Sequence, residues 1–224
     1  MHAKPGLRVV LKWTIARSGS VIADVMSLKT MIQLNQHDKD IFTVTGLLTA
    51  SECADLIARG ESIGFEPASV RTESGQKMMT NIRNNDRVVF TDEKLARELW
   101  ERIAAVLPIL DGTAPCGVDA CLRFYRYVPG QKFNRHKDGS VTNEQGEISK
   151  LSYLIYLNKC DGGETVFRDY VEIDGQRQKN EIRIEPEAGS ALLFRHERWH
   201  EGSPVASGKK YVIRTDVFYA NHAT

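Results

Sequence analysis

The sequence lacks an apolar run long enough to cross a membrane, because its apolar segments are short and interrupted by charge. A spanning helix needs about 20 predominantly apolar residues. The apolar stretch at residues 8–15 carries two cations, and it lacks the continuous apolar core of a secretory signal. We therefore expect no membrane association and a cytoplasmic location.

Cysteine is scarce and is not arranged for metal binding. None of the four cysteines forms a Cys-x-x-Cys pair of the kind found in structural zinc sites or redox motifs. Because no export signal is evident, we expect all four to be reduced thiols. These are Cys53, Cys116, Cys121 and Cys160.

Neither sign of charge dominates: 30 Lys and Arg face 29 Asp and Glu, for a net charge of +1. This balance gives no signal for a polyanionic partner, and we expect no nucleic-acid binding. Apolar residues make up 42% of the 224 residues, enough for a sizeable core. The sequence contains no internal repeat and no low-complexity linker, which favours one folded domain.

The first residues differ from the rest in charge, with five cations and one acid up to Lys29. We interpret residues 1–38 as a basic N-terminal extension and residues 39–224 as the folded domain. Three interpretations of the extension stay open: an organellar presequence, a poorly ordered segment, or a start codon assigned upstream of Met26 or Met31.

Two helices are predicted in the first half of the domain. Residues 49–52 read Thr-Ala-Ser-Glu, a capping box, and begin a helix that ends near Gly64. A cap at residues 91–93 begins a second helix, whose apolar positions are Leu95, Leu99, Ile103 and Leu107, and Pro108 ends it.

Short strands separated by turn residues follow from Leu122 onward. The candidates are residues 122–128, 151–158, 164–167, 181–184, 190–194 and 211–219. Many short strands bounded by Gly, Pro, Asn and Asp are typical of a jelly roll. We expect a mainly β fold with flanking helices, with helical support at about 39–112 and a jelly-roll core at about 113–222.

His136, Asp138 and His200 form a His-x-Asp pair followed by a distant His. Two imidazoles and one carboxylate, with no thiolate nearby, are typical of a non-haem Fe(II) site that leaves one face open for substrate and O2. His196 and His200 also form a His-x-x-x-His pair, as in zinc hydrolases. That motif needs a long helix, whereas the flank before His196 is typical of a strand, so we expect His200 to bind metal and His196 to be dispensable.

A cationic strand follows the triad. Side chains alternate across a strand, so Lys210, Val212 and Arg214 share one face. Two cations on one buried face need an anion, and a dicarboxylate held on the iron is such an anion. The residues therefore indicate an oxygenase that depends on 2-oxoglutarate.

The motifs and their order resemble the prolyl 4-hydroxylase branch of the Fe(II)/2-oxoglutarate dioxygenases over roughly residues 40–220. The stretches that carry the resemblance are residues 123–133 (RFYRYVPGQKF), 153–158 (YLIYLN), 162–167 (GGETVF) and 187–194 (EAGSALLF), together with the triad and Lys210. The resemblance implies a double-stranded β-helix, and Fe(II), 2-oxoglutarate, O2 and ascorbate as cofactors. It implies that Lys210 and Tyr127 bind the distal carboxylate of 2-oxoglutarate, with Arg214 as a second candidate.

The resemblance also implies hydroxylation of a peptidyl proline. We expect residues 67–85 and 139–150 to form a mobile rim, in which Arg83 resembles a substrate-contacting residue of the family. Where the family often has an arginine, this sequence has Ser149 and Lys150. Two alternatives therefore stay open: the same chemistry on a free amino acid or another small molecule, and a non-enzymatic jelly-roll module that binds a peptide or small acid.

Overall fold

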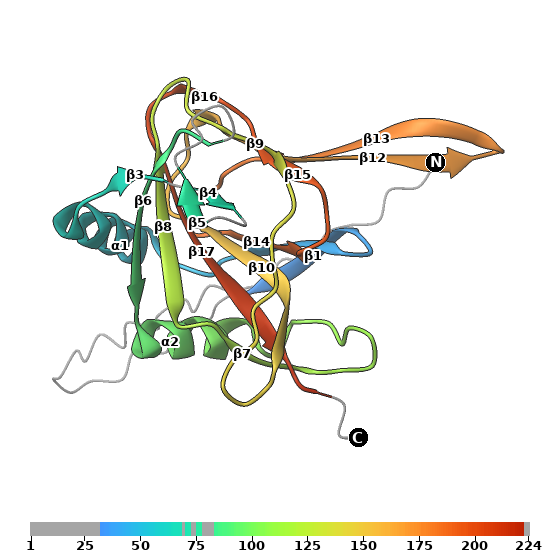
Figure 1. Ribbon diagram of the computed structural model, residues 1–224, viewed down its shortest axis with the longest axis horizontal. Helices are drawn as coiled ribbons and strands as arrows, with labels where there is room; N and C mark the ends of the chain where they lie inside the picture. Colours follow the sequence, from blue (N-terminus) through green and yellow to red (C-terminus); the bar gives the residue numbers. More distant parts are fainter. Residues whose placement is uncertain (1–31, 69, 73–74, 78–82, 222–224) are drawn as a thin grey trace, which may run out of the picture.

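The computed structural model describes residues 32–68, 70–72, 75–77 and 83–221 (Figure 1). All paired strands in this part of the chain are antiparallel, and most belong to two sheets. The large sheet has the order β1 (Gln33–Asp38), β2 (Ile41–Thr45), β14 (Ala191–Arg195), β10 (Ile148–Tyr156), β17 (Lys210–Tyr219), β8 (Cys121–Tyr127), β6 (Asp86–Thr91) and β3 (Glu66–Pro67), with β7 (Pro115–Val118) also paired to β17.

The smaller sheet has four strands, in the order β13 (Gln176–Ile184), β12 (Thr165–Ile173), β15 (His200–Gly202) and β9 (Phe133–His136). Two short pairs complete the described strands: β11 (Asp161–Gly162) with β16 (Val205–Ser207), and β4 (Val70–Thr72) with β5 (Gly75–Lys77). Antiparallel sheets with few helices confirm the predicted jelly-roll class with flanking helices.

Both predicted helices are present and begin where their caps indicate. Helix α1 spans Ala50–Ile63, and the capping box of Thr49 and Glu52 is complete. Helix α2 spans Glu93–Ile103, and its N-cap Asp92 accepts a hydrogen bond from the Leu95 amide. The predicted end of α2 at Pro108 was wrong, because the helix ends at Ile103. The next turn is tighter than an α-helix, since the Val106 amide donates to the Ile103 carbonyl three residues before it.

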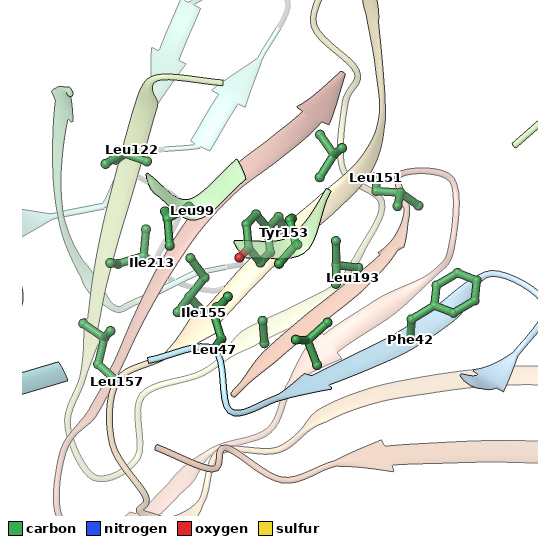
Figure 2. Packing of buried hydrophobic residues seen from close by; sticks show 14 of the residues in the cluster. Phe42, Leu47, Leu99, Leu122, Leu151, Tyr153, Ile155, Leu157, Leu193 and Ile213 are labelled. Carbon is green, nitrogen blue, oxygen red and sulfur yellow. The ribbon is translucent and has the colours of Figure 1, made fainter. Parts of the chain in front are cut away.

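The helices cover the outer face of the large sheet. Apolar side chains from α1 and α2 pack against β8, β10, β14 and β17, and this outer core is shown in Figure 2. Its fully buried members include Leu99, Leu122, Leu151, Tyr153 and Ile213. Burying a side chain of this size stabilises the fold by about 1.5–3 kcal/mol, so this layer fixes the sheet that carries the site.

The second core lies on the other face of the large sheet, where the smaller sheet packs. Strand β8 shows the alternation: Leu122 and Phe124 belong to the outer core, whereas Tyr125 and Tyr127 belong to the inner one. Its other buried members are Ile41, Tyr156, Phe167, Ile184, Leu192, Phe194, Val205 and Val212. The inner core contains buried tyrosines, and their hydroxyl groups allow polar contacts on this face.

Strands β2, β3 and β6 come from the range predicted as helical support, β1 comes from the predicted N-terminal extension, and all four complete the large sheet. The predicted boundary at residue 38 falls at the end of β1, which pairs with β2. The four cysteines are free thiols. No helix in the described ranges has the length and apolarity that a membrane span requires.

Hairpin β12–β13 is longer than the two short strands predicted there, and it projects from the body of the molecule (Figure 1). Its two-residue turn is Asp174–Gly175, and both residues have positive φ. Asp-Gly is a strong hairpin signal, but the polar composition of the outer strand segments concealed the strands.

Candidate active site

Three predicted metal ligands come together at one end of the smaller sheet. His136 on β9 lies directly opposite His200 on β15 in the antiparallel ladder, and Asp138 follows β9 by two residues. Ligand atoms from the three side chains lie within 4.8 Å of one another. The Nε2 atoms of His136 and His200 lie 3.6 and 3.7 Å from the Asp138 carboxylate oxygens.

The two histidines are oriented by the same local contact. The Nδ1 of His136 lies 2.9 Å from the carbonyl of Asn134, and the Nδ1 of His200 lies 3.0 Å from the carbonyl of Arg198. A carbonyl only accepts, so Nδ1 donates in each case and Nε2 is turned toward the site. Burial lowers the pKa of His200 to about 4, which leaves its imidazole neutral at pH 7.

Asp138 is held as a carboxylate. Burial alone would raise its pKa, but Arg214 and the two imidazoles keep the pKa well below its usual range. Arg214 Nη1 lies 3.4 Å from Asp138 Oδ1, and the Ser152 hydroxyl donates to Oδ2 at 2.6 Å. Two imidazoles and one ionised carboxylate are a donor set that suits Fe(II).

His196 lies outside this cluster. Its Nδ1 is 2.9 Å from the Ser152 hydroxyl and its Nε2 is 2.9 Å from the Ser149 hydroxyl. Since Ser152 donates to Asp138, His196 Nδ1 donates to Ser152 and Nε2 accepts from Ser149. His196 is therefore linked to the cluster through Ser152, a residue that the sequence prediction missed.

Lys210 is a buried cation that no described carboxylate pairs with. It is 4% exposed, its Nζ donates to the Gly163 carbonyl at 2.6 Å, and Nζ lies 5.4 and 5.3 Å from the ring centres of Tyr127 and Tyr156. Burial lowers its pKa to about 8. A buried cation with only a carbonyl as partner is costly unless an anion joins it.

Arg214 differs, because it already contacts two carboxylates. Its Nη1 faces Asp138, and its Nη2 lies 3.1 Å from Asp216 Oδ1. Asp216 is fully buried and also lies 3.4 Å from Arg123. The two predicted cations therefore share a strand face but occupy different electrostatic environments.

One pocket joins the triad to both cations. Its lining includes the three candidate ligands, Lys210 and Arg214, and also Tyr125, Tyr127, Phe133, Leu154, Thr165, Gly202 and Val212. The predicted Tyr127 is thus placed in the pocket, where burial raises its pKa to about 12 and keeps it a phenol. Thr165 was missed by the sequence prediction, although it lies in the Gly-Gly-Glu-Thr stretch.

Arg83 is buried rather than a solvated loop residue. Its guanidinium lies over the rings of Tyr125 and Phe133, 4.2 and 4.6 Å from their centres, and its Nε donates to Asn85 Oδ1 at 2.6 Å. Phe133 in turn stacks on His136, with ring centres 3.6 Å apart. Most of the remaining predicted rim at residues 69–82 lies outside the described residues or has no described side chains.

Comparisons with known proteins agree with this fold. Residues 122–215 match the family model of the 2OG-Fe(II) oxygenase superfamily, and this range contains the triad, Lys210 and Arg214. No curated protein matches the chain.

Three solved structures similar to this chain are prolyl hydroxylases. They are the viral collagen prolyl hydroxylase of Paramecium bursaria Chlorella virus 1 (TM-score 0.54, 21% identity, 81% of this chain and 97% of that chain), a Pseudomonas putida prolyl 4-hydroxylase (0.56, 22%, 81% and 93%), and the Trichoplax adhaerens prolyl hydroxylase in complex with a hypoxia-inducible factor peptide (0.60, 19%, 80% and 83%). At these identities the likeness concerns the fold.

The jelly roll and the His-Asp-His cluster define the class of a non-haem iron oxygenase. Residues 122–215 thus resemble the 2OG-Fe(II) oxygenase superfamily, which supports a 2-oxoglutarate-dependent dioxygenase. The family implies Fe(II), 2-oxoglutarate and O2.

Proposed function

We propose that the protein hydroxylates an unactivated C–H bond, with His136, Asp138 and His200 as the ligands of Fe(II). The observation that carries this proposal is the convergence of two Nε2 atoms and one carboxylate within 4.8 Å. When bound, Fe(II) supplies the oxidising chemistry that couples decarboxylation of 2-oxoglutarate to succinate and CO2 with transfer of oxygen to the substrate.

The chain's own residues orient these ligands and exclude water. The carbonyls of Asn134 and Arg198 keep the Nδ1 protons in place, and Ser152 fixes the Asp138 carboxylate. Aromatic rings pack against His200: the ring centres of Phe167 and Phe194 lie 5.9 and 4.5 Å from the centre of its imidazole. A dry, fixed ligand set is what an oxidising centre requires.

We assign the distal carboxylate of 2-oxoglutarate to Lys210, with Tyr127 as a second donor. Lys210 lacks a described acidic partner, whereas Arg214 is already paired with Asp138 and Asp216. The neutral phenol of Tyr127 lies under the Lys210 ammonium and donates a proton that a carboxylate can accept. Arg214 then serves mainly to hold Asp138.

A peptidyl proline is the substrate class that the family resemblance supports, with Arg83 as its contact and ascorbate as a reductant. A free amino acid or another small molecule is the second candidate, and two residues favour it. Ser149 donates to His196, and Lys150 Nζ contacts Thr113 Oγ1 at 2.7 Å and Asp111 at 3.0 Å. Neither is available for the role of the family's arginine.

The reaction class is tested by succinate release from 2-oxoglutarate with Fe(II), O2 and ascorbate, against the Asp138→Ala variant. Release that depends on Asp138 supports the oxygenase, and no release in the presence or absence of any candidate substrate supports a binding module. Peptides and free amino acids are then compared by mass spectrometry for the gain of one oxygen atom.

A further inference from the structure

Arginines gather around Tyr125 on the inner face of the large sheet. Tyr125 lies opposite Arg87 on β6 and opposite Val212 on β17, and the next inner pair along β8 and β17 is Arg123 with Arg214. The Arg83 guanidinium lies over the ring of Tyr125. Tyr125 itself lines the pocket of the metal cluster, so this positive charge borders the reaction site.

Arg83 differs from Arg123 and Arg214 in its carboxylate partners. Asp216 contacts both Arg123 and Arg214, and Asp138 contacts Arg214. Within the described ranges no carboxylate pairs with Arg83, which is only 6% exposed. It contacts the Asn85 amide oxygen and two ring faces, it interacts with the phenol groups of Tyr125 and Tyr127, and its Nη2 has no hydrogen-bond partner.

Arg126 is the comparison for Arg83, because it packs on an aromatic ring and also has carboxylate partners. It lies on the same strand as Tyr125 but on the opposite face, over the ring of Phe65 at 4.7 Å. Unlike Arg83, it reaches two carboxylates, Glu61 at 2.9 Å and Asp86 at 3.0 Å. Arg83 is more deeply buried and lacks both, although a buried charge is costly without a counter-ion.

Two unpaired donors belong to guanidiniums that interact with the phenol of Tyr125. Arg83 Nη2 and Arg214 Nε are both buried without a hydrogen-bond partner, and both guanidiniums act on Tyr125. Burial would raise the pKa of Tyr125, yet Arg83 and Arg214 lower it. The surroundings of this phenol therefore favour negative charge.

Arg83 and Lys210 are different cations near the pocket, although both interact with Tyr127. Lys210 and Arg214 lie four residues apart on β17, or about 13 Å along a strand. Arg83 reaches the metal cluster from another direction, through Phe133, which stacks on His136. Arg83 is thus a second cation near the pocket, in contact with its lining residues Tyr125 and Phe133, and only Lys210 is needed for the distal carboxylate of the co-substrate.

We propose that Arg83, together with Tyr125 and Arg214, binds a carboxylate of the prime substrate. The substrate is then a carboxylic acid that places its charge beside the metal, either a free amino acid or the C-terminal residue of a peptide. An internal proline of a peptide has no free carboxylate. The inference rests on the proposed function and names the substrate class of the same site.

The test compares carboxylic acids with their primary amides, which keep the shape and remove the charge. The protein is loaded with Mn(II) and 2-oxoglutarate under nitrogen, so that no turnover occurs. The probes are the proteinogenic amino acids, including L-proline, and their N-acetyl derivatives, each as acid and amide. Binding is measured by the paramagnetic relaxation of the probe protons, which also reports that the probe lies near the metal.

We expect at least one acid to bind better than its amide, and this preference to fall by about 30-fold or more in Arg83→Met. Arg83→Lys should keep part of the preference, and the control Arg126→Met should keep all of it. Free and N-acetylated acids distinguish a free amino acid from a peptide C-terminus, because only the second tolerates the acetyl group.

Equal binding of acid and amide throughout, or an acid preference that survives in Arg83→Met, would overturn the inference. The affinity for 2-oxoglutarate is measured on every variant by calorimetry. Unchanged affinity in Arg83→Met shows that the variant is folded and that the co-substrate end is intact. Absence of 2-oxoglutarate binding in the wild-type protein would instead contradict the proposed function, so the two failures are distinguishable.

Discussion

The hydroxyl of Ser152 donates to Asp138 Oδ2 at 2.6 Å, and the Ser152 hydroxyl oxygen lies 2.9 Å from His196 Nδ1. The donors therefore run in one direction, from Ser149 to His196, from His196 to Ser152 and from Ser152 to Asp138. All of these side chains are buried or nearly so. The relay fixes the rotation of the Asp138 carboxylate, while Arg214 holds its other oxygen.

Replacing Ser152 should therefore weaken metal binding without removing a ligand. We expect Ser152→Ala to lower the affinity for Mn(II) or Fe(II) by about 10–100-fold, the usual effect of losing an outer-shell partner. Ser152→Thr keeps the hydroxyl and should restore most of the affinity. Anaerobic metal titration measures the effect, with the exposed Ser207→Ala as control. Equal affinities in Ser152→Ala and the wild type would contradict a positioning role.

The assignment of the metal ligands predicts that their variants and His196→Ala differ in metal binding. His136→Ala, Asp138→Ala and His200→Ala should each abolish stoichiometric metal binding, because each removes one of three donors. His196→Ala should still bind one metal ion per chain, since His196 lies outside the cluster. Anaerobic titration followed by elemental analysis of the desalted protein gives the stoichiometry. Loss of metal in His196→Ala together with retention in His200→Ala would reverse the assignment.

The assignment of 2-oxoglutarate to Lys210 predicts a pH dependence. Burial lowers the Lys210 pKa from 10.5 to about 8, so the ammonium of the free protein is lost as the pH rises above 8. Affinity for 2-oxoglutarate should then fall by up to about tenfold for each further pH unit. Calorimetry under nitrogen with Mn(II) measures it, and Lys210→Arg should remove the dependence. The same dependence in Lys210→Arg would locate the titrating group elsewhere.

Lys210 should also reduce stability when no anion is bound. Because the Lys210 pKa is lower in the folded state than the unfolded value of 10.5, the unfolded state binds more protons between these two values. The destabilisation caused by burying the ammonium is therefore full below pH 8 and disappears as the pH rises toward 10.5. The shift corresponds to about 3 kcal/mol. Lys210→Met should therefore raise the free energy of unfolding in urea at pH 7, and the gain should shrink at pH 10. A loss of stability at pH 7 would contradict it.

The sequence carried the local signals of this fold well. The capping box at Thr49 and the cap at Asp92 predicted both helix starts, because capping depends on neighbouring residues alone. The positions of His136 and His200 were predictable because they follow strand patterns in a fixed order. The two histidines then meet as partners in one ladder, which no local pattern specifies.

The sequence could not reveal contacts that depend on burial. Arg83 is in a polar stretch, and its burial against Tyr125 and Phe133 arises only when β8 and β9 bring those rings beneath it. The link from His196 to Asp138 spans strands far apart in the sequence, so His196 appeared dispensable. Lys210 and Arg214 appeared equivalent on one strand face until the partners of Arg214 became known.

Arg214 provides the last prediction, because its partners assign it to Asp138 rather than to the co-substrate. Arg214→Met leaves Asp138 buried beside only the two imidazoles and takes one of two cations from Asp216. Breaking a buried pair in this way typically costs about 3–5 kcal/mol, which urea unfolding of the metal-free protein measures.

A bound divalent cation supplies the charge that Arg214→Met removes, so adding Mn(II) should stabilise the variant. The affinity for 2-oxoglutarate, once Mn(II) is saturating, should change much less than in Lys210→Ala. The opposite ranking, with Arg214→Met losing 2-oxoglutarate and Lys210→Ala retaining it, would make Arg214 the co-substrate anchor.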